Sequence, residues 1–312
     1  MMLVSEIAEL LGYDYVGEDC EVRNISTAAL AQEQEIAVCR RREDFLLTKA
    51  RVLLSKPTLA ATDKTLLLTF EDLDLSMIKV CKLLISRKIL PDYSLPSTYA
   101  LRPGGFYTGE NCSISETACI QPGVVIGDCV RIGEGCVLEP YAVIGSGTIL
   151  HDYVRIGFGS KIGADAFFHY YEDGKPRHFV GKGAVEIHNH TCIGSHTVVQ
   201  RGTFSNTVIG VNTMIGNGID IGHDVTIGDH CKIVSHTGIA GNATLGNHVL
   251  VYGRVSINNG VTVGNHVVVK ATTSVTKSVR DGETVFGPFG RRFSHEMKQI
   301  AKLRHFLEGK DE

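Results

Sequence analysis

The sequence predicts a mainly β protein, with a parallel β-helix of hexapeptide repeats, a small N-terminal α/β domain and a C-terminal α-helix. Three observations carry this prediction. An aliphatic residue recurs every six positions beyond residue 110, all but two of the 34 glycines lie beyond residue 100, and amphipathic helical spacing is found at both ends. A fixed short period indicates a solenoid, because each repeat buries its apolar side against its neighbours.

The six-residue period runs through 24 hexads, with only two interruptions. The aliphatic positions fall in phase over residues 114–162, 187–199 and 209–275. We expect three hexads to form one triangular coil, with the aliphatic residue inward and glycine or asparagine at the tight corners. Eight such coils at about 4.8 Å each make a prism about 40 Å long.

The two interruptions predict loops at 163–186 and 200–208. Asp173-Gly174 between alternating aromatic and polar residues indicates a projecting β-hairpin. Loops ejected from a rigid solenoid commonly carry binding groups, whereas the alternative is a neutral surface insertion. The aromatic residues at 167–171 favour a function, because they are too apolar for a free loop.

The N-terminal region, residues 1–100, has the pattern of a small α/β domain. Ser5 is expected to cap a helix over residues 6–11, apolar runs at 50–54 and 65–70 suggest strands, and residues 77–85 fit a second helix. The basic run at 40–42 either meets a phosphate or lies on a solvated edge.

The β-helix is expected to span residues 101–290, followed by a basic amphipathic helix over 291–312. Ser294 is its expected cap, and apolar residues keep helical spacing from Met297 to Leu307. Five positive charges and one negative charge between residues 291 and 307 would suit an acidic partner such as an acyl carrier protein. The alternative is packing against copies of the same helix.

Composition excludes several classes of protein. No window approaches 18 apolar residues, so we expect no transmembrane helix, and the N-terminus lacks the pattern of a secretory signal. The formal charge of −3 argues against a general nucleic-acid binder. Nine cysteines without a CxxC pair indicate reduced thiols in the cytoplasm, and neither a disulfide framework nor a zinc site.

The histidines fall into a structural group and a candidate catalytic one. His230, His248 and His266 are 18 residues apart in G-[DN]-H turns, so they should stack in a straight ladder that does not converge on a metal. His223 lies one position earlier in its hexad and is a candidate general base toward an amine or hydroxyl. Gly241 lies one coil further on, where its amide could stabilise an oxyanion.

The chain also resembles a known family. The segments TVVQRGTFSNTVIG, GNGIDIGHDVTIGD and IAGNATLG resemble those of left-handed β-helix acyltransferases, and most of all the UDP-3-O-(3-hydroxyacyl)glucosamine N-acyltransferase family of lipid A biosynthesis. The N-terminal order, a SEIAELLG helix followed by ISTAALAQEQEI, is similar as well. The likeness therefore extends over nearly the whole chain.

The resemblance implies roles for particular residues. His223 matches the family's general base, Gly241 the glycine that faces the thioester carbonyl, and Asn217 a polar residue just before the histidine segment. The loop that carries Phe167 matches an aromatic loop beside the neighbouring subunit's site. The family is homotrimeric, has left-handed coils, needs no metal or permanently bound cofactor, and uses an acyl carrier protein thioester.

The sequence also departs from the family pattern. Gln200 stands where the family has Asp, Gly260 stands where it has a second histidine, and Phe45 is left as the plausible stacking residue of the N-terminal nucleotide-sugar pocket. His236, in VSHTGIAG, is a further candidate for substrate binding.

Together these observations predict transfer of an acyl chain, 3-hydroxyacyl on a carrier protein, to the amino group of a UDP-linked acylated glucosamine. The main alternative is a coenzyme A-dependent N-acetyltransferase acting on another nucleotide-linked amino sugar for surface polysaccharide. Two other readings are a zinc-dependent carbonic anhydrase, which needs three converging histidines, and a non-catalytic scaffold.

Overall fold

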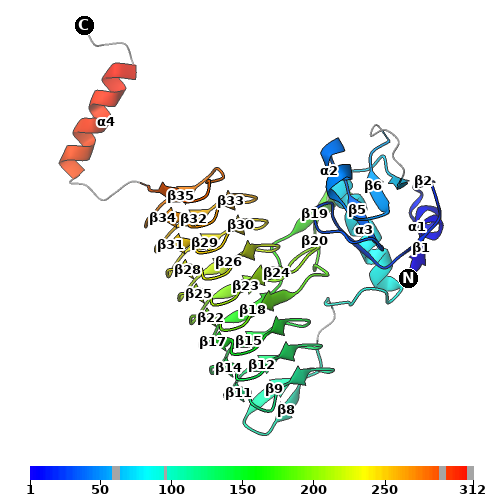
Figure 1. Ribbon diagram of the computed structural model, residues 1–312, viewed down its shortest axis with the longest axis horizontal. Helices are drawn as coiled ribbons and strands as arrows, with labels where there is room; N and C mark the ends of the chain where they lie inside the picture. Colours follow the sequence, from blue (N-terminus) through cyan, green and yellow to red (C-terminus); the bar gives the residue numbers. More distant parts are fainter. Residues whose placement is uncertain (58–63, 95–96, 288–292, 308–312) are drawn as a thin grey trace.

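The computed structural model describes residues 1–57, 64–94, 97–287 and 293–307. A small α/β domain lies beside a long prism of stacked β-coils, and a single helix projects beyond the last coils (Figure 1). The prism is a left-handed parallel β-helix.

The N-terminal domain is built on a five-stranded sheet. Three parallel pairings join β4 to β5, β5 to β6 and β6 to β7, and β2 is antiparallel to β7 at the edge. In spatial order the strands are β2 (Asp14–Val16), β7 (Thr65–Leu68), β6 (Val52–Ser55), β5 (Glu35–Val38) and β4 (Asn24–Thr27). A separate short pair joins β1 (Met2–Leu3) to β3 (Glu21–Val22).

Three helices complete this domain: α1 (Val4–Leu11), α2 (Arg42–Leu47) and α3 (Leu73–Ser86). The predicted cap at Ser5 is wrong, because α1 begins one residue earlier and Ser5 lies within it. The Ser5 hydroxyl instead donates to Asp19 at 2.7 Å, and the carboxylate of Glu6 accepts from the Leu3 amide at 3.1 Å. The second predicted helix lies inside α3, which Asp72 caps by accepting from two backbone amides.

All 24 predicted hexads are strands, β10–β18 and β21–β35. Neighbouring coils pair in parallel with the inward residues in register, as Ile114 with Ile132 and Ile215 with Ile233. The strands form three flat sheets of eight, nine and ten strands. The prism exceeds the eight expected coils, because β9 and β36 add pairings outside the hexads that were counted.

The eight-stranded sheet contains β10 (Ser113–Ile114), β13 (Arg131–Ile132), β16 (Ile149–Leu150), β21 (Val185–Ile187), β24 (Thr207–Ile209), β27 (Thr226–Ile227), β30 (Thr244–Leu245) and β33 (Thr262–Val263). The nine-stranded sheet contains β11 (Cys119–Ile120), β14 (Val137–Leu138), β17 (Arg155–Ile156), β22 (Cys192–Ile193), β25 (Met214–Ile215), β28 (Lys232–Ile233), β31 (Leu250–Val251), β34 (Val268–Val269) and β36 (Thr284–Val285). The ten-stranded sheet contains β35 (Ser274–Val275), β32 (Ser256–Ile257), β29 (Gly238–Ile239), β26 (Asp220–Ile221), β23 (Val198–Gln200), β18 (Lys161–Ala164), β15 (Val143–Ile144), β12 (Val125–Ile126), β9 (Phe106–Thr108) and β8 (Ala100–Arg102).

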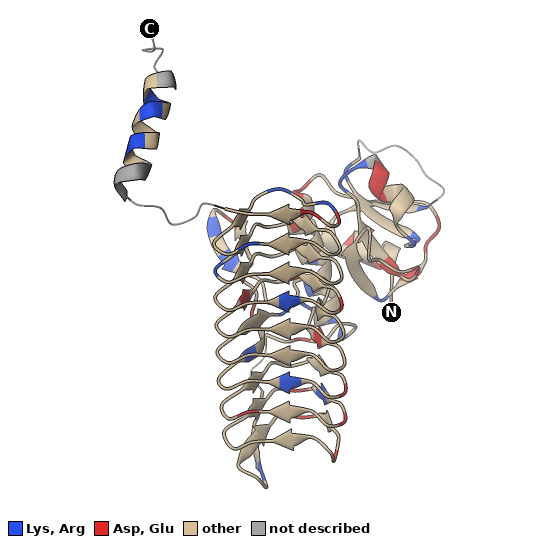
Figure 2. Ribbon diagram, turned by 60° about the vertical axis from the view of Figure 1, so that its left-hand side comes forward, with Lys and Arg blue, Asp and Glu red and all other residues tan. Residues whose placement is uncertain are grey.

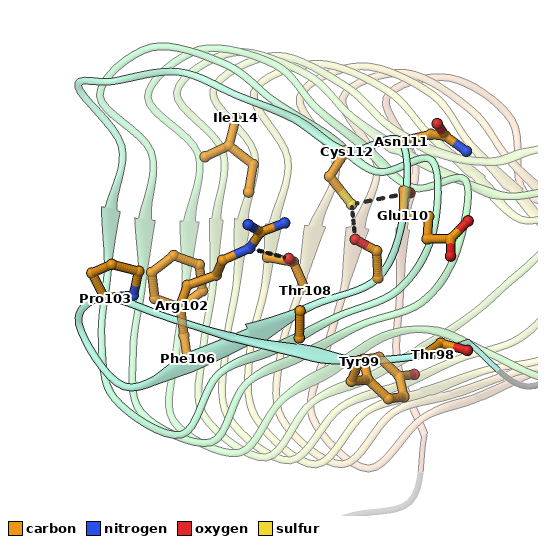
Figure 3. A pocket seen from close by; sticks show the side chains of 12 residues that line it. Thr98, Tyr99, Arg102, Pro103, Phe106, Thr108, Glu110, Asn111, Cys112 and Ile114 are labelled. Carbon is orange, nitrogen blue, oxygen red and sulfur yellow. Dashed lines mark hydrogen bonds between the residues drawn. The ribbon is translucent and has the colours of Figure 1, made fainter.

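The inward aliphatic residues form one continuous buried column from Val124 to Val279. At the first coil this column is open to a cavity of about 590 Å³, shown in Figure 3. There Arg102, on the antiparallel hairpin of β8 and β9, donates from Nε to the Thr108 hydroxyl at 2.7 Å. The hairpin thus partly covers the apolar end of the prism, which would otherwise lie exposed.

The predicted histidine ladder is confirmed. The His230, His248 and His266 rings stack at centroid distances of 4.9 and 4.8 Å, close to the coil spacing. All three occupy corners with φ between 56° and 58°, a left-handed backbone that polar residues tolerate better than aliphatic ones. Their role at these corners is structural.

The predicted hairpin in the first insertion is confirmed as well. Strands β19 (His169–Glu172) and β20 (Lys175–His178) pair antiparallel around Asp173 and Gly174, which have φ of 51° and 70°. Two positive φ values are what a type I′ turn requires. The hairpin lies against the N-terminal domain, because Tyr170 and Phe179 belong to the buried cluster formed with α1 and α3.

Helix α4 (Phe293–Leu307) stands apart from the prism and carries exposed basic side chains (Figure 2). It already includes the expected cap Ser294, while Arg291 and Arg292 lie outside the described residues. Four apolar side chains are exposed on it as well: Met297, Ile300, Leu303 and Leu307. In the described parts of the chain, no helix is both long and apolar enough to cross a bilayer.

Candidate functional site

A cavity of about 630 Å³ lies along the ten-stranded sheet, outside β26, β29 and β32. It is lined by four of the residues predicted from sequence, His223, Gly241, Phe167 and Gln200. It also contains residues that sequence analysis did not single out, Asp220, Gly238, Ser256, Asn258 and Asn259. The 18-residue coil and the two insertions therefore bring the candidate groups into one cavity.

His223 is held by its neighbour in the chain. Its Nδ1 lies 2.9 Å from Oδ2 of Asp224, and both side chains are largely buried. An ionised carboxylate only accepts hydrogen bonds, so Nδ1 carries the proton and Nε2 keeps its lone pair. Gly241 lies next to Nε2, since a Cβ built there would be 2.6 Å from that atom. Nε2 of His223 thus lies over the glycine of the next coil.

The second insertion, residues 200–208, wraps around the carboxylate of Asp224. That carboxylate accepts from the Thr203 amide at 2.9 Å, the Ser205 amide at 3.0 Å and the Ser205 hydroxyl at 2.8 Å. The turn needs Gly202, because a Cβ there would lie 1.5 Å from the Ser205 carbonyl oxygen.

The ionised state of Asp224 follows from these bonds. Burial alone raises the pKa of this carboxyl, but hydrogen bonds from His223, Thr203 and Ser205 outweigh burial and lower its pKa to about 2. An ionised carboxylate at this position orients the imidazole by accepting a hydrogen bond from Nδ1 of His223.

Gly241 also interrupts a series of hydrogen bonds along one corner of the prism, in which each corner side chain accepts from the backbone amide one coil earlier. We call this series the hydrogen-bond ladder. At the same corner in earlier coils, Asp128 accepts from the Glu110 amide at 2.7 Å, and Ser146 accepts from the Asp128 amide at 3.0 Å. Gly241 has no side chain to accept from His223 in this way. Among the described residues, no hydrogen-bond acceptor is found for the Gly241 amide itself. That N–H is therefore available to a ligand beside the imidazole.

The first insertion supplies an aromatic wall. Phe168 meets the His223 ring edge-on, with centroids 5.8 Å apart at 85°, and packs against Phe204 of the second insertion. Phe167 is 81% exposed at the cavity, and its amide donates to Oε1 of Gln200 at 3.3 Å. One aromatic residue therefore fixes the imidazole and the other is open to a ligand.

Three predicted binding residues do not line this cavity. Asn217 lies at the previous corner, where its Oδ1 accepts from the Ser195 amide at 2.8 Å. His236 lies one coil above that corner with φ of 62°. Phe45, on α2, packs against a small cluster that includes Ala31 and Leu53. Their substrate-binding roles stay predictions.

The first two residues of the basic run lie beside acidic side chains, although Arg41 is 75% exposed. Arg40 pairs with Asp74, and Arg41 lies 3.9 Å from Asp44. The side chain of Arg42 lies outside the described residues.

Sequence reasoning missed Asp224 and Asp220. Asp224 follows His223 directly, so the GHD triplet was the available signal. Asp220 lies in the cavity on β26, and burial raises the pKa of its carboxyl. A carboxyl group that stays protonated more readily than usual can donate as well as accept hydrogen bonds.

The chain is similar to known proteins in part of its sequence and in its fold. Residues 129–164 match the model of a family described as bacterial transferase hexapeptide (six repeats). The matched segment lies within the β-helix, from β13 to β18.

Among individual proteins, the chain is 34% identical over 84 residues to a UDP-3-O-acylglucosamine N-acyltransferase of Agrobacterium fabrum. That match spans 27% of this chain and about a quarter, 24%, of that relative. Two solved structures share the fold. The UDP-N-acetylglucosamine acyltransferase from Campylobacter jejuni has a TM-score of 0.51 and 21% identity, covering 58% of this chain and 68% of the other. The Arabidopsis enzyme of the same name has a TM-score of 0.50 and 22% identity, covering 60% and 69%.

Proposed function

We propose that the chain is an N-acyltransferase that moves a 3-hydroxyacyl group from a thioester to the amino group of a UDP-linked acylated glucosamine, as a step of lipid A assembly. The observation that carries this proposal is the His223 imidazole, held by Asp224 with Nε2 over the unpaired Gly241 amide. The likeness to acyltransferases that act on UDP-linked glucosamines supports the acceptor class.

The geometry suits acyl transfer in a direct way. The amine nitrogen attacks the thioester carbonyl while Nε2 of His223 removes a proton from that nitrogen. The Gly241 amide donates to the oxygen that becomes negative, and Asp224 stabilises the imidazolium. When the tetrahedral intermediate collapses, the carbon–sulfur bond breaks and the thiolate leaves with the proton from His223. Every proton is accounted for without another reactant.

The remaining parts have proposed roles in substrate handling. Phe167 and Gln200 lie at the cavity and are proposed to contact the acyl chain or the sugar. Phe45 is proposed to stack on the uracil ring in the N-terminal domain. The basic α4 is proposed to contact an acyl carrier protein, and the assembly is proposed to be a homotrimer in the cytoplasm with sites between adjacent prisms.

The test is a donor comparison with purified protein. Hydroxyacyl carrier protein, acetyl coenzyme A and a blank would each be offered with UDP-3-O-acylglucosamine, and the product followed by mass. We expect turnover with the hydroxyacyl carrier protein. Turnover with acetyl coenzyme A alone, or none with this acceptor, would overturn the proposed substrates and favour another amino sugar.

A matched variant pair links that turnover to the site. His223→Ala should abolish turnover, while His248→Ala, a ladder histidine outside the cavity, should keep it. Equal activity of the two variants would refute the mechanism even if the substrates were right.

A further inference from the structure

A second group of side chains converges outside the acyl-transfer cavity. His151, Glu186 and His188 each offer one ligand atom, and these atoms all lie within 4.8 Å of one another. Oε1 of Glu186 is 2.8 Å from Nε2 of His151 and 3.9 Å from Nε2 of His188. In the described parts of the chain, no other three histidines, cysteines or acids meet this condition.

The β-helix itself creates this convergence. Leu150 on β16 pairs with Ile187 on β21, so the residues that follow them, His151 and His188, lie one above the other on the outside of the prism. Their rings stack with centroids 4.7 Å apart at 10°. Glu186 precedes Ile187 on the same strand and points to the same outer side, because side chains alternate along a strand. Two coils thus present three ligands from one face.

The distances suit a small transition-metal ion. With bonds of about 2.0–2.1 Å, two ligands of a tetrahedral zinc ion lie roughly 3.3 Å apart. The two observed distances, 2.8 and 3.9 Å, lie on either side of that value, so small side-chain rotations would bring all three atoms to one ion. The side chains are 26–38% exposed, which leaves room for water in the remaining position.

We propose that His151, Glu186 and His188 form a binding site for a divalent transition-metal ion of the zinc class. Two imidazoles and one carboxylate favour zinc, cobalt or nickel over magnesium and calcium, which prefer oxygen ligands. The site differs from the histidine ladder, which stacks rings at the same spacing but has no carboxylate between them. It also departs from the sequence-based expectation that the chain needs no metal.

The position of the site indicates what the ion does. β16 and β21 belong to neighbouring coils, and the chain between them includes all but the last two residues of the first insertion, 163–186. A shared ion would tie the coil before the insertion to the coil after it. An ion that binds the folded chain better than the unfolded one raises thermal stability. The ion is therefore a clamp on the base of the insertion, and none of its three ligands lines the acyl-transfer cavity.

The experiment uses the full-length chain, stripped of metal with a chelator and titrated with Zn²⁺ against a chromophoric indicator. We expect one Zn²⁺ per chain and a higher Tm with the ion bound. Glu186→Gln and His188→Ala should each weaken binding at least about tenfold, whereas His248→Ala should bind as the original chain does. Circular dichroism of the metal-free variants checks that they fold.

Three results would overturn the proposal: no stoichiometric uptake, unchanged binding in both site variants, or equal weakening in His248→Ala. Cobalt provides an independent check, because its visible spectrum separates nitrogen and oxygen ligands from thiolates. A thiolate spectrum would assign the ion to the cysteines instead. None of these results depends on which acyl donor the protein uses.

Discussion

The same corner of the prism behaves differently in its early coils and at the candidate site. At Asp128 and Ser146, each side chain accepts a hydrogen bond from the backbone of the coil before it. At His223 and Gly241, one coil has an imidazole and the next has no side chain, so the ladder is broken. In the regular coils, polar corner side chains form hydrogen bonds with the backbone of the neighbouring coil. At the interrupted corner, the Gly241 amide and Nε2 of His223 are left for a ligand.

The insertions explain why the break is tolerated. In the regular coils, the polar corner residues are held by the repeat itself, as Asn247 is between Asp229 and Asn265. At the site, the second insertion replaces that support by surrounding Asp224 with five donors besides His223. The candidate site thus lies where the repeat is interrupted and an inserted loop supplies hydrogen bonds to the residue beside the imidazole.

The sharpest test of this comparison removes the imidazole. His223→Ala should lower kcat by about 10²–10⁴-fold, because general-base help of this kind is lost. Asp224→Asn should lower kcat by about 10²-fold or more, since an amide no longer fixes the tautomer. Steady-state kinetics with saturating donor measures both. Retention of more than a tenth of kcat in His223→Ala would show that the broken corner is not the catalytic one.

The next test repairs the ladder. Gly241→Asn restores the side-chain acceptor that the regular corners possess. It also places a Cβ only 2.6 Å from Nε2 of His223. We expect kcat to fall by about 10²–10³-fold, because the new side chain displaces the imidazole and covers the Gly241 amide, and Tm to fall because a largely buried ring must move. Kinetics and thermal unfolding of one preparation measure both. A fully active Gly241→Asn enzyme would contradict the role of the open glycine.

These features differ in how far the sequence reveals them. The 24 strands could be predicted because each inward residue must repeat at one fixed spacing to stack in a single column. The same spacing placed Gly241 beside His223, since 18 residues is one coil. The histidine ladder followed from that arithmetic too.

Features that depend on the inserted loops or on domain packing, and not on the six-residue period, could not be predicted from the sequence in this way. Asp224 owes its surroundings to the loop at 200–208, whose path depends on packing with Phe168 and the N-terminal domain. The His151 and His188 rings stack, although the two residues are 37 positions apart in the sequence. An insertion separates their coils, so no 18-residue count relates them. Phe45 lies in another domain, and its position relative to the cavity follows from domain packing.

Acid should reduce the contribution of the interrupted corner to the free energy of unfolding more than that of the regular corners. The folded pKa of Asp224, about 2, lies below its ordinary value of 3.8, so its contribution is complete above about pH 4 and is lost as pH falls toward 2. The shift corresponds to about 2 kcal/mol of unfolding free energy. Unfolding of the original chain and of Asp224→Asn, compared from pH 5 to pH 2, measures it. The difference between them should shrink in acid, and a constant difference would argue against the buried ionised carboxylate.

The smallest effect is expected from a substitution that removes one hydrogen bond of a regular corner. Asn247→Gly removes the acceptor for the Asp229 amide, which donates to Asn247 Oδ1 at 2.9 Å. It imitates Gly241 at a corner where Asp229 stands in the place of His223. The freed amide is exposed and can bond to water, so we expect a loss of only about 1 kcal/mol in unfolding free energy. Activity should be unchanged, because Asn247 does not line the cavity. Chemical unfolding and kinetics together measure this. A large loss of activity would contradict this expectation. It would mean that the hydrogen-bond ladder at Asn247 helps to position the cavity residues from a distance.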